Sequence, residues 1–302
     1  MPPQQRHSKL TPVNIFLCVL AIVYLIYLGA LARSFYPSVS TPAQAISEHV
    51  VDTSPSVVVT HWTAAHMRDA VDIDQQLGKV PSLTGSDIDT RKDKAAKQRG
   101  QAPRTAESSY PLSTVGKVFF NNDAGQDYVC SGTAVTSSNR SVVDTAGHCL
   151  YLYGSWAQNV IFCPLYDNSN TPYGCWAARD LEVPSDWIDA RPNDLHHDFG
   201  MAIVAPNSQG VLTDQVGGAG WAYNQSVDQP FYAYGYPAGY PFDGQTRQSC
   251  DGSAGKTWSH GGGTVVSIPC NMTGGSSGGP WFIKIRGSWY LNGHNDFVSG
   301  LQ

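Results

Sequence analysis

Short apolar runs separated by turn residues dominate the chain from residue 115 onward. They are rich in β-branched and aromatic residues, and after residue 113 no long segment repeats its apolar positions every 3.6 residues. The clearest runs are 115–120, 128–135, 141–143, 198–204, 231–236 and 264–268. Runs of this length between Gly, Asn, Asp and Pro residues are typical of strands. The pattern therefore predicts an all-β barrel or sandwich.

The first 32 residues have a different pattern. Residues 1–12 are polar and include Arg6 and Lys9, residues 13–28 are almost wholly apolar, and Gly29-Ala30-Leu31-Ala32 follows. This order is typical of a signal peptide, which we expect to span residues 1–32 and to be cut after Ala32. An uncleaved signal anchor is the alternative, because the apolar stretch is just long enough to span a membrane.

Residues 33–112 are polar and poor in aromatic side chains, and they include a basic run at 91–99. Such composition predicts a solvated segment, either a propeptide or a flexible linker. Basic runs in exposed segments are good proteolytic targets. We expect processing between Arg99 and Thr114.

Composition narrows the function classes. The 302 residues carry a net charge of −5, with 41% hydrophobic and 14% charged residues. This balance does not favour nucleic acid as a partner, and a membrane partner is expected only if residues 1–32 stay uncleaved. No CxxC or HExxH motif is present, so neither a metal nor a cofactor is predicted.

The cysteines suggest an oxidising compartment. Of the seven, Cys18 lies in the N-terminal apolar run. Six remain for the globular part, enough for three disulfides. They are Cys130, Cys149, Cys163, Cys175, Cys250 and Cys270.

Three stretches carry residue types suited to acyl transfer. His148 follows an apolar strand, Asp198 begins another, and Ser277 lies in the glycine-rich stretch 274–280 (GGSSGGP). Hydrolysis through a serine needs a base, a carboxylate that orients the base, and backbone N–H groups that meet the oxyanion. A lone histidine is more often structural, but the order His, Asp, Ser supports a catalytic reading.

The three stretches resemble the signatures of trypsin-like serine proteases: 145–149 (TAGHC), 197–202 (HDFGMA) and 276–280 (SSGGP). Residues 234–237 (YGYP) look similar to the bacterial glutamyl-endopeptidase-like branch. The resemblance covers about 115–297. It implies two six-stranded antiparallel barrels, at 113–210 and 211–302, with the active site between them.

The resemblance also implies a role for each site residue. His148 would be the general base, Asp198 its orienting carboxylate and Ser277 the nucleophile. The backbone N–H groups of Gly275 and Ser277 would form the oxyanion hole. Cys130 and Cys149 match the family's bridge beside the histidine, and Cys163–Cys175 and Cys250–Cys270 are the simplest remaining pairs.

Four features depart from the family pattern. Ser276 replaces the aspartate that precedes the nucleophile in the animal enzymes. Asp144 stands at a strand position that is usually apolar, where it needs a partner if buried and could disturb His148 if it faces the site. His197 adjoins Asp198 and is a rival base, but neighbours on a strand point to opposite faces. The family continues beyond the point where this chain ends, which leaves open a truncated second barrel.

Substrate preference rests on two residues. His294 falls near the position of the histidine that binds a glutamate side chain in the glutamyl-endopeptidase-like branch, and Thr273 lies near a hydroxyl position used by the same branch. The resemblance thus allows a preference for acidic side chains.

The leading hypothesis is a secreted, monomeric serine endopeptidase acting on protein or peptide substrates through an acyl-enzyme. The rival is a non-catalytic extracellular binding module with a protease-like fold, suggested by Asp144, Ser276 and the short C-terminus. An α/β-hydrolase is disfavoured because in that fold the acid and the histidine follow the serine.

Overall fold

The computed structural model describes residues 45–75, 109–189, 196–260 and 263–297, all within one compact unit, Ala45–Gln302. The predicted signal peptide, the basic run at 91–99 and Cys18 lie outside these residues. In the part of the chain that the structure describes, no helix is both long enough and apolar enough to cross a membrane.

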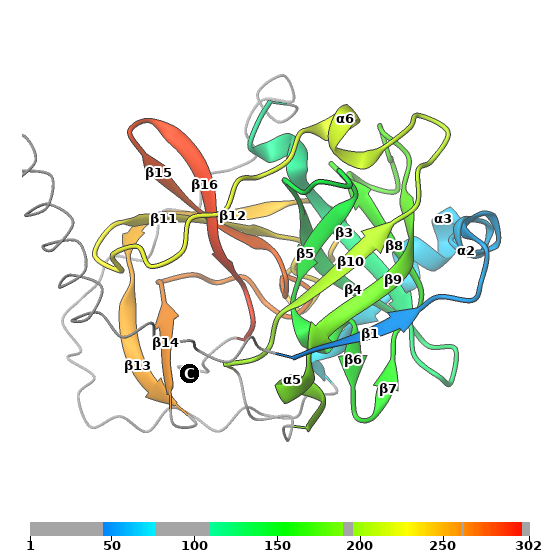
Figure 1. The fold of residues 1–302 in the computed structure, drawn as a ribbon, viewed down its shortest axis with the longest axis horizontal. Coiled ribbons are helices and arrows are strands. Elements are labelled where there is room, and N and C mark those ends of the chain that lie inside the picture. Colours follow the sequence, from blue (N-terminus) through cyan, green and yellow to red (C-terminus); the bar gives the residue numbers. More distant parts are fainter. Residues whose placement is uncertain (1–44, 76–108, 190–195, 261–262, 298–302) are drawn as a thin grey trace, which may run out of the picture. The chain divides into compact units, whose positions relative to one another are not determined.

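Six antiparallel strands form a closed barrel in the first half of the fold (Figure 1). They are β3 (Val115–Asn121), β4 (Asp127–Val135), β5 (Val142–Thr145), β8 (Gln158–Pro164), β9 (Trp176–Pro184) and β10 (Gly200–Val204). The order is β9-β10-β5-β4-β3-β8, and pairing of β8 with β9 closes the circle. Val118, Val143, Trp176 and Leu181 fill the interior.

The second half has a four-stranded antiparallel sheet, ordered β12-β11-β15-β16, and a separate hairpin of β13 and β14. These strands are β11 (Pro230–Gly235), β12 (Gln248–Ala254), β13 (Lys256–His260), β14 (Gly263–Ser267), β15 (Pro280–Ile285) and β16 (Ser288–His294). The all-β, two-barrel prediction is confirmed. Among the described residues, however, the six strands of this half are divided four and two.

Short elements connect the strands. They are η2 (Leu112–Thr114), η3 (Gly147–Cys149), β6 (Tyr151–Leu152), β7 (Ser155–Trp156), α5 (Ser185–Asp189) and α6 (Leu212–Val216). The structure forms all three expected disulfides, Cys130–Cys149, Cys163–Cys175 and Cys250–Cys270. The first joins β4 to η3 and so fixes the turn that carries His148.

Residues 45–75, which we call the docked segment, have regular structure. Its elements are β1 (Ile46–Val50), α2 (Pro55–His61), α3 (Ala64–Asp69), β2 (Val71–Asp72) and η1 (Ile73–Gln75). β1 pairs antiparallel with β9, and β2 pairs parallel with β4. The composition of 33–112 predicted a solvated propeptide or flexible linker; within 45–75, Val58, Trp62 and Met67 are nevertheless buried against the barrel.

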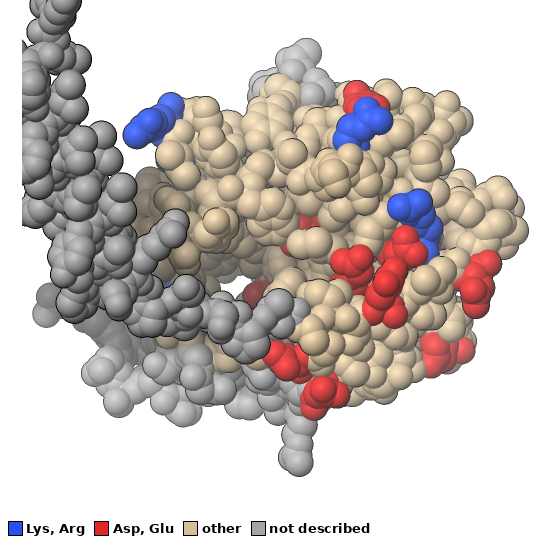
Figure 2. Space-filling view, in the orientation of Figure 1, with Lys and Arg blue, Asp and Glu red and all other residues tan. Residues whose placement is uncertain are grey.

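On the face shown in Figure 2, the acidic side chains of the described residues gather on the side of the first barrel. Lys and Arg side chains lie apart from one another on this face and form no continuous basic surface there. Arg140 is one of the exposed basic residues, and its guanidinium contacts the carboxylate of Asp214 at 2.8 Å.

Candidate active site

Strand pairing brings His148 and Asp198 together. β10 pairs with β5 so that Gly200 lies opposite Thr145, which places the residues just beyond each strand end side by side. Nδ1 of His148 lies 2.8 Å from Oδ2 of Asp198, and the backbone N–H of His148 donates to Oδ1 at 2.8 Å. Because an ionised carboxylate only accepts hydrogen bonds, it fixes the proton on Nδ1 and orients the ring.

Ser277 lies in the turn that precedes β15. Gly275 and Gly278 on either side of it have φ values of +91° and +79°, a region that favours glycine. Ser131 of β4 ties this turn to the first barrel: its backbone N–H donates to the carbonyl of Ser277 at 2.8 Å, and its hydroxyl donates to the carbonyl of Gly275 at 2.9 Å. Nothing in the local sequence indicates Ser131, because its role depends on a contact with Ser277, 146 residues away (277 − 131).

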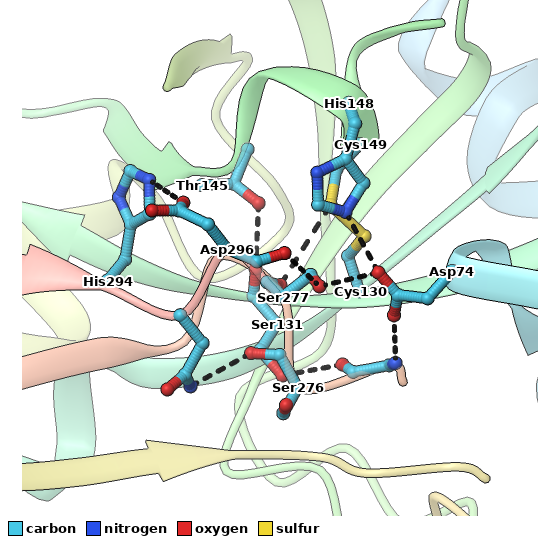
Figure 3. Close-up of a disulfide and its surroundings, with 12 residues drawn as sticks. Asp74, Cys130, Ser131, Thr145, His148, Cys149, Ser276, Ser277, His294 and Asp296 are labelled. Carbon is cyan, nitrogen blue, oxygen red and sulfur yellow. Dashed lines mark hydrogen bonds and ion pairs between the residues drawn. A yellow bond between two sulfur atoms is a disulfide. The ribbon is translucent and has the colours of Figure 1, made fainter. Parts of the chain in front are cut away.

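Asp74 of the docked segment contacts both Ser277 and His148 (Figure 3). The hydroxyl of Ser277 donates to Oδ1 of Asp74 at 2.9 Å, and the same oxygen lies 3.3 Å from Nε2 of His148. The backbone N–H of Gly275 donates to Oδ2 at 2.8 Å. The structure thus gathers His148, Asp198, Ser277 and Gly275 in one place, together with Asp74 from a segment expected to be solvated.

The charges around His148 stabilise its protonated form. Burial lowers the pKa of His148, but the carboxylates of Asp198 and Asp74 outweigh burial and raise this pKa to about 10. Burial alone would raise the pKa of Asp74, yet His148, Gly275 and Ser277 together lower it. An ionised Asp74 therefore faces an imidazolium near neutral pH, and an imidazolium cannot accept the serine proton.

Asp144, the residue that fitted the family pattern least well, has a partner. Its side chain is 1% exposed, and its Oδ2 lies 3.0 Å from Nδ1 of His294, at the end of β16. Nε2 of His294 lies 3.1 Å from the carbonyl of Asp198 and 3.0 Å from Oδ1 of Asp296. Burial lowers the pKa of His294, but Asp144 and Asp296 raise it well above its usual value. Asp144 therefore contacts His294, not His148.

The two residues proposed to bind substrate are held by protein contacts. Both ring nitrogens of His294 are engaged as described, and the Thr273 hydroxyl donates to the carbonyl of Gly239 at 2.7 Å. Ser276 donates its hydroxyl to the carbonyl of Thr273 at 2.8 Å, which braces the turn before the nucleophile. Nε2 of His197 lies 3.6 Å from Oδ2 of Asp186.

Two groups of described residues have the donor atoms of a metal site. Cys130, His148 and Cys149 form one, but the two sulfurs are joined in a disulfide and cannot ligate as thiolates. His61, His66 and Asp127 form the other, with all three ligand atoms within 4.8 Å of one another. The sequence did not indicate this group, because Asp127 is distant from the two histidines along the chain.

Comparison with solved structures identifies similar proteins. The protease Anisep from Arthrobacter nicotinovorans is 39% identical, with a TM-score of 0.57, and the match covers 64% of this chain and 87% of that chain. The thermostable serine protease AL20 from an extremophilic microorganism is 41% identical, with a TM-score of 0.54, covering 61% of this chain and 85% of that chain. No family model matches the chain, and no curated protein matches it.

Proposed function

This chain belongs to the trypsin-like serine proteases, and on that premise we propose that it is a secreted serine endopeptidase acting through Ser277, His148 and Asp198. The observation that carries the proposal is the buried hydrogen bond between His148 and Asp198, 2.8 Å long, beside the hydroxyl of Ser277. A buried carboxylate that orients a histidine next to a serine is the arrangement that activates a hydroxyl nucleophile.

The residues take successive roles in the proposed reaction. His148 accepts the proton of Ser277 through Nε2 as the oxygen attacks the peptide carbonyl. The negative oxygen of the tetrahedral intermediate is bound by the backbone N–H of Gly275, with that of Ser277 as second donor. His148 then protonates the leaving amine, and water resolves the acyl-enzyme by the same steps.

The contacts of Asp144 and Ser276 count against the rival reading, a non-catalytic binding module. Asp144 is paired with His294, and its contact with that ring leaves the His148–Asp198 bond in place. Ser276 donates a hydrogen bond to the carbonyl of Thr273 and so supports the turn that carries Ser277. The turn therefore has a support that does not depend on the aspartate of the animal enzymes.

A preference for acidic side chains stays a prediction that depends on His294. The carboxylates of Asp144 and Asp296 already face that imidazolium, which reduces the charge it can offer to a substrate carboxylate. The measurement is kcat/KM of the processed protein for matched peptides with Glu, Gln or Arg before the scissile bond. Cleavage of the Glu peptide no faster than the Gln peptide would remove the acidic preference.

Secretion and zymogen processing are part of the same proposal. Three disulfides suit an oxidising compartment, and the N-terminal pattern resembles a signal peptide. N-terminal sequencing of the secreted protein is expected to find a start between Arg99 and Thr114. A mature protein that still starts at Arg33 would contradict processing.

Labelling with a fluorophosphonate tests the catalytic proposal directly. The processed protein should react once, at Ser277, and Ser277→Ala should abolish the label. Ser138→Ala, in an exposed turn, is the matched control and should label like the wild type. A folded, processed protein that takes no label would favour the binding-module reading.

A further inference from the structure

The Asp74 carboxylate occupies the positions that a reacting substrate would need. One of its oxygens accepts from the N–H of Gly275, where the oxyanion is expected. Its other oxygen accepts from the hydroxyl of Ser277 and contacts Nε2 of His148. The nucleophile, the base and an oxyanion donor are therefore all engaged by one side chain.

The chemistry of this group makes it an inhibitor and not a substrate. The contacting atoms belong to a side-chain carboxylate, which is negatively charged and has no amine leaving group. Attack by Ser277 on its carbon would have to expel oxide or water, in contrast to the amine expelled from a peptide bond. The carboxylate resembles instead the acid product of peptide hydrolysis, with its charge held by the donors that bind the oxyanion.

Packing holds this carboxylate in place. Val58, Trp62 and Met67 of the docked segment are buried against barrel side chains that include Phe119 and Ile161. The Trp62 indole N–H donates to the carbonyl of Asn159 at 2.6 Å. A side chain at Gly274 would collide with the carboxylates of the segment, so the glycine permits the close approach.

From these contacts, and resting on the function proposed above, we propose that residues 45–75 are a built-in inhibitor of this protease, with Asp74 as its inhibitory group. Among the described residues, the docked segment is anchored by strand pairing and apolar packing against the barrel and by the contacts of Asp74 with Gly275 and Ser277. A cut in the chain between Gln75 and Ser109 therefore leaves the inhibitor bound. Full activity requires dissociation or destruction of the segment in addition to that cut.

The test compares fluorophosphonate labelling rates of the intact full chain, with mass spectrometry to confirm that the chain is uncut. Asp74→Ala and Asp74→Asn should label roughly 10- to 100-fold faster than the wild type, because each removes charge-assisted hydrogen bonds to the site. Asp69→Asn is the matched control, since Asp69 is an exposed aspartate of the same segment. It should label at the wild-type rate.

A second readout does not depend on activity. In the full chain with Ser277→Ala, the His148 ring is titrated by NMR with and without Asp74→Asn. Loss of the carboxylate should lower the pKa of His148, because Asp74 is one of the two charges that raise it. An unchanged pKa would show that Asp74 does not contact the ring and would overturn the proposal.

The outcomes separate this proposal from the proposed function. If the processed protein labels but the Asp74 variants label no faster than the intact wild type, the inhibitor proposal fails and the protease proposal stands. If neither the processed protein nor any variant labels, the protease proposal fails and inhibition fails with it.

A different group of residues points to a metal site where the docked segment meets the barrel. Nε2 of His61 lies 3.4 Å from Oδ1 of Asp127, and Nδ1 of His66 lies 3.0 Å from Oδ2. The amide of Asn121 donates to Oδ1 of Asp127 and orients the carboxylate. Zinc bound tetrahedrally at about 2.0–2.1 Å separates its ligand atoms by roughly 3.3 Å. One ligand atom from each of the three residues lies within 4.8 Å of the others, so small side-chain rotations bring them to that spacing.

We infer that His61, His66 and Asp127 bind zinc, with water as the fourth ligand. Two ligands come from the docked segment and one from β4, so zinc would strengthen docking. Calorimetric titration of the full chain carrying Ser277→Ala with zinc chloride should show one site. Asp127→Asn or His66→Ala should weaken binding at least about tenfold, whereas His197→Ala, a histidine outside the group, should not. Equal binding by the Asp127 variant, or none by the parent protein, would overturn the site.

Discussion

Replacing Asp144 with Asn should destabilise the protein strongly, because it leaves a buried imidazolium without one of its two carboxylates. The Asp144 and His294 side chains are 1% and 8% exposed, and their contact is 3.0 Å. At that distance, with an effective dielectric constant of about 20, the gross attraction is about 5–6 kcal/mol. Removing one partner of a buried pair typically costs about 3–5 kcal/mol, which is the loss that we expect.

The assay is urea unfolding of the full chain with Ser277→Ala, which prevents self-digestion, with and without Asp144→Asn at pH 7. The double change Asp144→Leu with His294→Leu is the control. It removes both charges together, so it should be less destabilising than Asp144→Asn alone. A loss of stability below about 0.5 kcal/mol for Asp144→Asn would refute the reasoning, since changes of that size are ordinary at surface sites.

The pH dependence gives a second check on the same pair. The folded-state pKa of His294 is raised well above its ordinary value of 6.5. The stability from its protonation is therefore fully present below about pH 6.5 and is lost as the pH rises through the folded-state pKa. The wild type should lose more stability toward alkaline pH than Asp144→Asn does, and identical slopes would contradict this account.

Two further predictions concern the orienting carboxylate and a buried lysine. Asp198→Asn should reduce kcat of the processed protein about 10⁴-fold, the loss typical of a Ser-His-Asp triad, because the ring loses its orienting acceptor. The measurement is kcat for ester hydrolysis by the folded variant, and turnover at the wild-type rate would refute the prediction. Lys117 is buried between the Phe119 and Tyr166 rings and donates to the carbonyl of Gly244, and burial lowers its pKa from 10.5 to about 7 despite Asp243. Because the unfolded chain binds the proton more tightly, stability falls as the pH drops from about 10.5 to 7, by up to about 5 kcal/mol. Lys117→Met should flatten this part of the stability profile measured by urea unfolding, and an unchanged profile would count against a neutral buried lysine.

Local sequence patterns predicted the class of fold and pointed to His148, Asp198 and Ser277, but not to Asp74 or Ser131. The strand that ends shortly before His148, the strand that begins after Asp198 and the glycines around Ser277 each depend on neighbours in the chain. Apolar runs of strand length, with no helical repeat after residue 113, were enough to predict an all-β fold. The signals are local because strand formation and turn geometry are set within a few residues.

Only the tertiary structure decided which partners these residues have. The contacts of Asp74 with Ser277 and of Asp144 with His294 span 203 and 150 residues. Polar composition made residues 45–75 resemble a solvated linker, although a few apolar side chains suffice to dock them once the barrel offers a surface. A buried charge requires a partner, but strand order and register determine which one it meets.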